Sequence, residues 1–156
     1  MSKSLKRVKR TAEELGLEIE VVETAIDTHT AEQAAQSQGC HVDQIAKSII
    51  FRGEISDMAI LFLTAGGNRV DAQKASQLAG EPLGKADAAL IRAQTGFAIG
   101  GVSPIGHLNP IQTFIDPRLL EFDVLWAAAG TPRHVFAIAP QTLVDVTGAT
   151  VAAFTA

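Results

Sequence analysis

Apolar residues recur along the chain with two spacings, which predict different elements. Residues 5–15 carry apolar side chains at helical spacing, so a first helix is expected there. Residues 18–23 alternate between acidic and apolar side chains, which is typical of a half-buried strand. Thr30, with Gln33 three positions later, forms a capping box, and Gly39 can end the helix that this box starts. The beginning of the chain is therefore predicted to run helix, strand, helix.

Two longer apolar runs in the middle of the chain predict a pair of adjacent core strands. Residues 45–52 and 58–64 are rich in β-branched and other large apolar side chains, and a turn near Gly53 lies between them. Two such runs joined by a short turn favour a β-hairpin. We therefore expect this hairpin to lie in the core of the fold.

Helical and strand patterns are interspersed through the rest of the chain. Asp71 and Asp87 can each cap a helix, and a glycine follows at the expected end of each one. Three further strands and a last helix are predicted at residues 113–115, 124–126, 134–138 and 140–148. Because strands and helices do not alternate strictly, we expect an α/β (α+β) fold with a mixed, curved or barrel-like sheet surrounded by helices.

The composition is that of an ordinary globular domain. The chain has 156 residues, of which 47% are hydrophobic and 19% charged, so residues 1–156 are expected to form a single domain around one core. The single cysteine, Cys40, allows no intramolecular disulfide, which fits a reducing cytoplasm. Glycines and prolines interrupt the longest stretch without charged residues, 93–115, so no membrane-spanning helix is expected.

The charge of the chain limits the kind of nucleic-acid binding it can support. The net charge is −4, so the overall positive field of a protein that coats nucleic acid is missing. Basic residues do crowd the first predicted helix, at Lys3, Lys6, Arg7, Lys9 and Arg10. The simplest interpretation of this cluster is a solvated helix face, with a local binding patch as the alternative.

Lys47 is the first candidate for chemistry. The period of a strand places it on the same face as Ile45, Ile49 and Phe51. One interpretation is a lysine at the mouth of the strand that extends its ammonium to water. The other is a lysine that points into a pocket, where its charge can hold an ester carbonyl, a phosphate or a developing oxyanion. Periodicity alone does not decide between them.

The glycine-rich loop at residues 100–106 is the second candidate. Its glycines let backbone N–H groups approach a ligand closely, and Pro104 fixes part of its path. The loop matches neither the G-x-G-x-x-G dinucleotide fingerprint nor the P-loop. On the pattern alone, a tight connection between strands is the simpler alternative.

No motif for a metal site or a catalytic triad accompanies these candidates. None of the four histidines has the spacing of a metal motif: His29, His41, His107 and His134. Ser103 lacks the G-x-S-x-G elbow of a serine hydrolase. Cys40 and His41 are adjacent, and adjacent side chains generally diverge, so they form no catalytic pair. We therefore expect no metal and no cofactor.

Taken together, three segments carry a resemblance to a known family. They are residues 45–52, residues 68–71 with Lys74, and residues 96–107. In their order and separations they resemble the YbaK/ProX family of free-standing aminoacyl-tRNA deacylases, which is related to the editing domain of bacterial prolyl-tRNA synthetase. The similarity extends from about residue 30 to residue 148. It implies a mixed sheet wrapped by helices, with a pocket between the lysine strand and the G-x-x-x-P loop.

The resemblance also implies roles for individual residues. The essential lysine of the family corresponds to Lys47, which would contact the ester carbonyl or a phosphate. The backbone of the G-x-x-x-P loop would surround the terminal adenosine and the aminoacyl ester, and it corresponds to Gly100, Gly101, Val102, Ser103 and Pro104. A third family position, histidine or aspartate, is placed at His134. The resemblance implies that the nucleophile is water, so neither a triad nor a cofactor is needed.

The implied substrate is a mischarged tRNA, bound by its acceptor end. Apolar pocket walls from Ile49, Val102 and Ile105 would favour a small uncharged aminoacyl group: alanine, cysteine, serine, threonine or 2-aminobutyrate. The tRNA would be tRNA(Pro) or a related one, and an aminoacyl-tRNA synthetase is a possible partner. Two alternatives stay open: a non-catalytic adaptor for a tRNA or a synthetase, and a hydrolase of another acylated adenosine nucleotide.

Overall fold

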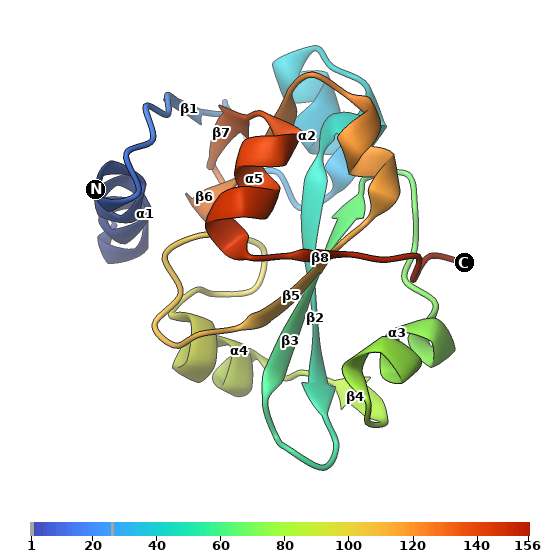
Figure 1. Cartoon of the computed structure of the whole chain (residues 1–156). Helices are drawn as coiled ribbons and strands as arrows, with labels where there is room; N and C mark the ends of the chain where they lie inside the picture. Colours follow the sequence, from blue (N-terminus) through green and yellow to red (C-terminus); the bar gives the residue numbers. More distant parts are fainter. Residues whose placement is uncertain (1, 26) are drawn as a thin grey trace.

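The strands of the protein divide between two open sheets (Figure 1). The computed structural model describes residues 2–25 and 27–156. In this part of the chain, one sheet has the strand order β4-β2-β3-β5-β8 and the other the order β1-β7-β6. The predicted combination of a mixed sheet with surrounding helices is confirmed, and the strands that were expected in one sheet are shared between two.

The larger sheet is built on the predicted hairpin. β2 (Ala46–Gly53) and β3 (Ala59–Ala65) run antiparallel, with Lys47 opposite Thr64. Three more strands complete the sheet: β4 (Leu83–Lys85), β5 (Gln112–Ile115) and β8 (Thr150–Val151). β3 lies between β2 and β5 and is buried along its whole length. Its burial holds the neighbouring strand β2, and with it Lys47, in a fixed register.

The smaller sheet is antiparallel and consists of β1 (Val21–Glu23), β6 (Leu125–Thr131) and β7 (His134–Ile138). An isolated parallel bridge between Trp126 of β6 and Ile45, the residue directly before β2, joins the two sheets. The beginning of β2 therefore meets β6 where the two sheets come together.

Five α-helices surround the sheets within the described residues: α1 (Lys3–Glu14), α2 (Ala31–Gln38), α3 (Ala72–Ala79), α4 (Ala88–Thr95) and α5 (Pro140–Thr147). The predicted caps are confirmed, because Thr30 forms its capping box and both Asp71 and Asp87 accept backbone hydrogen bonds. No helix in this part of the chain has the length and apolar character needed to cross a membrane.

Several short elements were not predicted from the sequence. They are β4, β8 and two short 3-10 helices, η1 (Val42–Gln44) and η2 (Pro117–Glu121). Each spans five residues or fewer, which is too short to show a period of its own. β4 and β8 pair with β2 and β5, and η1 and η2 begin at side-chain caps formed by His41 and Asp116.

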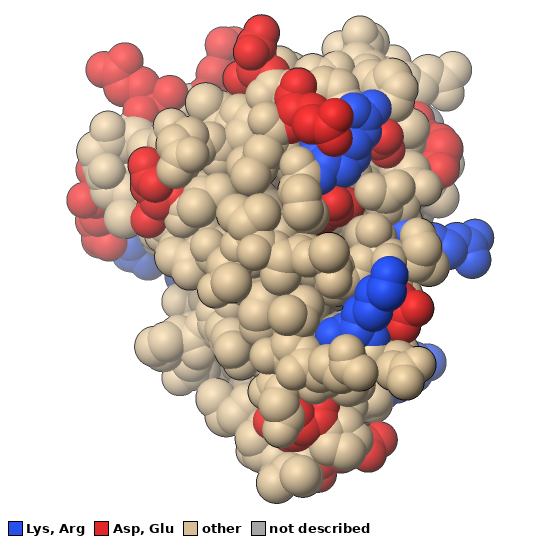
Figure 2. Space-filling view, turned by 45° about the vertical axis from the view of Figure 1, so that its right-hand side comes forward, with Lys and Arg blue, Asp and Glu red and all other residues tan. Residues whose placement is uncertain are grey.

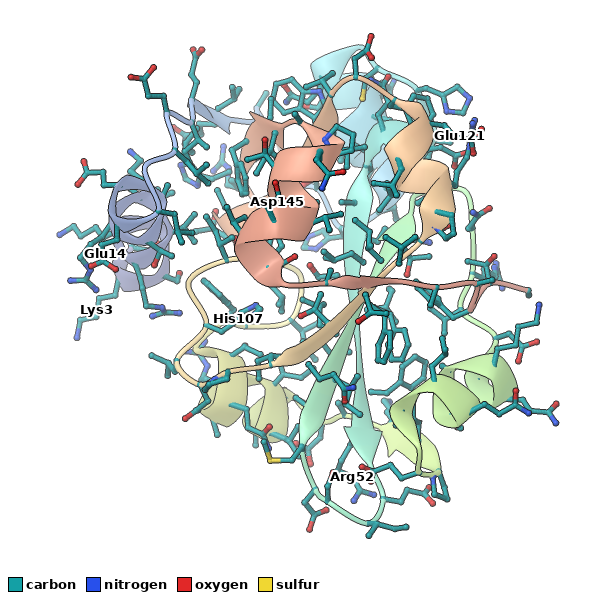
Figure 3. The ribbon with its side chains drawn as sticks, viewed as in Figure 1. Lys3, Glu14, Arg52, His107, Glu121 and Asp145 are labelled. Carbon is teal, nitrogen blue, oxygen red and sulfur yellow. The ribbon has the colours of Figure 1, made fainter. Side chains whose placement is uncertain are left out.

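Helix α1 packs against the smaller sheet through Leu5, Val8 and Ala12, which are buried. Figure 3 shows Lys3 on the opposite side, pointing away from the molecule. The prediction of a solvated basic face is confirmed for the four lysine and arginine residues that are exposed on this helix. It is wrong for Arg7, which is partly buried and donates hydrogen bonds to the loop between α4 and β5.

Candidate active site

The predicted lysine and part of the predicted loop line one cleft of about 620 Å³. Its walls come from the beginning of β2, the turn after β3, β6, and the segment that leads into α2. Three of the predicted site residues line it: Lys47, Gly100 and Val102. The volume falls within the roughly 300–1,000 Å³ of small-ligand pockets in proteins.

Lys47 lies on the wall of the cleft and is held by the turn that follows β3. Its Nζ donates a hydrogen bond to the backbone carbonyl of Asn68 at 2.6 Å. The turn passes close to η1, where a side chain at Gly66 would collide with the carbonyl of Val42. Of the two interpretations open at the sequence level, this placement favours the lysine that points into a pocket.

The surroundings of Lys47 change its acid–base behaviour. Partial burial lowers the pKa of Lys47 below its usual 10.5, and the nearby charge of Arg69 acts in the same direction. The carboxylate of Glu32 opposes this shift without cancelling it. Because the ammonium has lost part of its hydration, it interacts more strongly with a developing negative charge than a solvated lysine does.

A buried carboxylate, Asp116, holds the turn that positions the lysine. Only 2% of this residue is exposed. Its Oδ2 accepts hydrogen bonds from the Ala65 N–H at 3.1 Å and from the side-chain amide of Asn68 at 2.9 Å. Asp116 thereby fixes the residue whose carbonyl binds Lys47. Asp116 was not predicted as a site residue, although an aspartate directly after an apolar strand and before Pro117 is a visible signal for a cap.

A second carboxylate holds the same turn from the side of η1. Asp43 accepts a hydrogen bond from the Gly67 N–H at 2.7 Å and another from Arg118 Nε at 3.0 Å. Partial burial raises the pKa of Asp43, but the hydrogen bonds from Arg118 and Gly67 outweigh it, so the pKa lies below its usual 3.8. The carboxylate therefore stays charged at neutral pH, and the turn is bonded on both sides.

The glycine loop approaches β6 very closely. Gly100 lines the cleft with a φ of +91°, in the left-handed region that favours glycine. A Cβ at Gly101 would lie 2.8 Å from the Cα of Thr131, closer than packed atoms tolerate. Val102 follows, lines the cleft and is otherwise buried in the core. The loop can form this wall only because residue 101 has no side chain.

The rest of the predicted loop lies behind this wall. Ser103 is fully buried, and its Oγ accepts a hydrogen bond from the Ile105 N–H at 3.3 Å. Pro104 and Ile105 line a separate pocket of about 410 Å³ between the ends of α1 and α5. Of the residues expected in the apolar wall, Ile49 and Val102 line the cleft, and Ile105 lines the separate pocket instead.

His134 begins β7 and reaches the cleft only through a neighbour. Its Nδ1 lies 2.6 Å from Oγ1 of Thr131, which does line the cleft. The next residue of the strand, Val135, lines the cleft directly, because successive side chains of a strand point to opposite faces. A contact between His134 and a substrate stays a prediction.

One buried hydroxyl on the cleft has no hydrogen-bond partner. Among the described residues, Oγ of Ser48 is the buried side-chain polar atom for which no partner is present, and Ser48 lines the cleft next to Lys47. A buried, unpaired hydroxyl is costly unless a ligand completes it. Residues 2–25 and 27–156 contain no group of three or more His, Cys, Asp or Glu side chains that could hold a metal ion.

Comparison with known proteins agrees with this geometry. A model of the aminoacyl-tRNA editing domain matches residues 26–146. The chain is 33% identical over 140 residues to the uncharacterised protein YwhH of Bacillus subtilis, covering 90% of this chain and 88% of the relative. It is 25% identical over 125 residues to EbsC of Enterococcus faecalis, a candidate Cys-tRNA(Pro)/Cys-tRNA(Cys) deacylase, covering 78% of this chain and 74% of that protein.

A solved structure shows that the similarity extends through the whole fold. The crystal structure of a candidate trans-editing enzyme for prolyl-tRNA synthetase matches this one with a TM-score of 0.93 and 44% identity. The match covers 100% of this chain and 99% of the other. The family expected from the resemblance is confirmed. The chain therefore belongs to the family of aminoacyl-tRNA editing domains, and its activity is that of an aminoacyl-tRNA deacylase.

Proposed function

We propose that the protein, acting as one domain, hydrolyses the ester that joins a small, uncharged amino acid to the wrong tRNA. The proposed amino acids are alanine, cysteine, serine, threonine and 2-aminobutyrate. One observation carries the proposal: the partly desolvated ammonium of Lys47 is fixed on the wall of a cleft that the glycine loop also lines. A fixed cation and backbone N–H groups in one cleft are suited to stabilise a developing oxyanion.

The proposed reaction needs no protein nucleophile. Water attacks the carbonyl carbon of the aminoacyl ester, and a tetrahedral oxyanion forms. The bond between that carbon and the terminal ribose oxygen then breaks, so the ribose recovers its hydroxyl and the amino acid leaves. Lys47 contacts the carbonyl oxygen or a phosphate, and the backbone of residues 100–104 orients the adenosine and the ester. An aminoacyl ester is already reactive toward water, so positioning the water and the ester accounts for much of the rate enhancement that hydrolysis needs.

The walls of the cleft favour a small aminoacyl group. Ala46, Ala127, Ala128 and Val135 contribute short apolar side chains, and Ser48, whose buried hydroxyl has no partner within the described residues, also lines the cleft. A synthetase gains only about 1–3 kcal/mol of discrimination from one methylene, so it misactivates amino acids smaller than its own. A second pocket that admits only small groups removes these errors.

We further propose that the substrate is tRNA(Pro) or a related tRNA, bound in the cytoplasm by its acceptor end and delivered by an aminoacyl-tRNA synthetase. The likeness to EbsC and to the candidate trans-editing enzyme supports this choice. In Figure 2, basic side chains occur in isolated groups beside acidic ones and form no continuous basic surface on the face shown. A net charge of −4 also favours few phosphate contacts, so affinity is expected to depend weakly on salt.

The test is release of amino acid from a panel of tRNAs mischarged with amino acids of increasing size, and correctly charged prolyl-tRNA serves as the control. We expect rapid hydrolysis of one or more small members and none of the control. A folded protein that binds tRNA and hydrolyses no member would support the adaptor instead. Hydrolysis of acylated adenosine nucleotides without hydrolysis of any tRNA would support the other alternative.

A further inference from the structure

Arg7 connects helix α1 to both ends of the segment 96–106, which contains the glycine loop. Its Nε donates a hydrogen bond to the carbonyl of Gly106 at 2.7 Å, and its Nη2 donates one to the carbonyl of Gly96 at 2.9 Å. These two carbonyls lie on either side of the segment that carries Gly100 and Val102. The guanidinium is planar and presents its donors in a fixed geometry, so the two bonds set the separation of the loop ends.

The surroundings of Arg7 are built to receive it. Its guanidinium carbon lies 4.6 Å from the centre of the Phe97 ring, which is fully buried. Gly96 and Gly106 both have a positive φ, and a side chain at Gly96 would collide with the guanidinium. Burial lowers the pKa of Arg7, with a further contribution from the charge of Arg10, but an arginine stays protonated in proteins. The free-energy cost of removing water from the guanidinium is offset by its two hydrogen bonds and its contact with the Phe97 ring.

Further contacts support the glycine loop from behind and connect helix α1 to β6. The ring of His107 is edge-on to Phe97 at 6.0 Å, and its Nε2 lies 2.7 Å from the carbonyl oxygen of Ser103. Figure 3 shows His107 in the loop between α4 and β5. Ser4, on the same helix as Arg7, donates a hydrogen bond to the carbonyl of Gly130 at 2.8 Å. Gly130 directly precedes Thr131, against which Gly101 packs. Helix α1 therefore holds both the loop and the end of β6.

We propose that Arg7 is a positioning residue for the deacylation reaction. It does not line the cleft; it holds the ends of the loop so that the backbone around Gly100 and Val102 stays in the conformation that orients the ester. This inference rests on the proposed function of the loop. Without the two bonds, the loop samples other conformations, and only the fraction of molecules in the competent one reacts efficiently. The expected loss is therefore in kcat more than in KM.

The test compares Arg7→Ala, Arg7→Lys and the control Arg10→Ala, an exposed basic residue of the same helix. Single-turnover and steady-state deacylation of a mischarged tRNA that the wild type hydrolyses are measured well below the melting temperature of each variant. We expect Arg7→Ala to lower kcat about tenfold or more with little change in KM, and Arg7→Lys to recover part of it. Added methylguanidinium should raise kcat of Arg7→Ala, which it does not do for a variant that is merely less stable.

Hydrogen exchange of the free protein separates this inference from the proposed function. Arg7→Ala should speed exchange of the amides at residues 97–103 and leave those of β3 unchanged. Wild-type kcat in folded Arg7→Ala, or unchanged exchange in the loop, would overturn the positioning role. A lower kcat with neither recovery in Arg7→Lys nor rescue by methylguanidinium would overturn it as well. A wild type that hydrolyses no mischarged tRNA would instead contradict the proposed function, and the exchange data would still decide whether Arg7 holds the loop.

Discussion

Two walls of the cleft are built in different ways. The wall that carries Lys47 belongs to β2, which pairs with β3 over seven residue pairs and is held along its length by backbone hydrogen bonds. The wall that carries Gly100 and Val102 is a loop without regular backbone pairing of its own. It is held at its ends by Arg7 and pressed against β6 through Gly101.

The difference teaches where the rigidity of each wall comes from. Many backbone hydrogen bonds hold a strand inside a sheet, so the substitution of one side chain changes the position of the strand little. A loop held by a few long-range contacts depends on each of them. Substitutions behind the loop should therefore affect catalysis more than substitutions on the outer part of the hairpin. The exception on the strand side is the turn after β3, which carries the partner of Lys47 and depends on Asp116.

The largest expected effect on stability comes from removing that carboxylate. Asp116→Ala leaves the buried Ala65 N–H and the partly buried Asn68 amide without their acceptor, and an unpaired buried group costs about 1–3 kcal/mol. We expect the free energy of unfolding, measured with urea, to fall by about 3 kcal/mol. The control Asp123→Ala, at an exposed carboxylate, should change it by less than about 0.5 kcal/mol. Equal effects of the two substitutions would show that Asp116 does not hold the turn.

Gly101→Ala should come next, because it damages the loop wall directly. The new methyl group would lie 2.8 Å from backbone atoms of Thr131, and overpacking of this kind costs about 1–3 kcal/mol. We expect a matching loss in urea unfolding and a lower deacylation rate. Gly84→Ala is the control, since the nearest atom to its methyl group is the flexible carboxylate of Glu54 at 3.0 Å. A Gly101→Ala protein with wild-type stability and rate would contradict the close approach of loop and β6.

The pH dependence of stability tests the packing behind the loop. Burial lowers the pKa of His107 below its usual 6.5; the hydrogen bond to Ser103 opposes the shift and the charge of Arg7 adds to it. Between its usual pKa and the lowered one, the His107 ring is protonated in the unfolded protein and neutral in the folded protein. The free energy of unfolding therefore falls as the pH drops below about 6.5 toward the lowered pKa. His107→Gln should reduce this fall between pH 7.5 and 5.5 in thermal unfolding scans. An unchanged slope would mean that the ring is solvated.

The smallest expected effect is at Ser48 on the lysine wall. Ser48→Ala removes a buried hydroxyl that has no partner within the described structure, so stability should stay the same or rise by up to about 1 kcal/mol. Ser76→Ala is the opposite case, because Ser76 Oγ donates to the Ala72 carbonyl and accepts from the Leu83 N–H. That substitution should cost about 1 kcal/mol. A clear loss of stability in Ser48→Ala would reveal a partner that the free protein already supplies.

The lysine wall was largely predictable from the sequence, because its signals are local. The hairpin, the capping box at Thr30 and the caps at Asp71 and Asp87 each involve residues a few positions apart. The period of the strand also placed Lys47 on the same side as Ile49, and both line the cleft. The glycine pattern singled out the loop at residues 100–106, and the sequence resemblance added the family and the role of the loop.

The loop wall was less predictable, because its contacts join distant parts of the chain. Arg7 binds Gly96 and Gly106, and nothing near Arg7 in the sequence distinguishes it from the exposed cations of the same helix. Asp116 holds Asn68 in the same long-range way. At β7, a shift of one residue exchanges His134 for Val135 as the side chain on the cleft, since successive residues face opposite ways.

The most direct test of the central claim is single-turnover deacylation of a small mischarged aminoacyl-tRNA by the wild type, Lys47→Ala and Lys47→Arg, all shown to be folded. Loss of a group that stabilises an oxyanion typically costs about 10²–10³ in rate, so Lys47→Ala should be slower by that factor. Lys47→Arg should retain part of the rate, because it keeps the charge in a different geometry. A wild-type rate in folded Lys47→Ala would contradict the role of this lysine in the reaction.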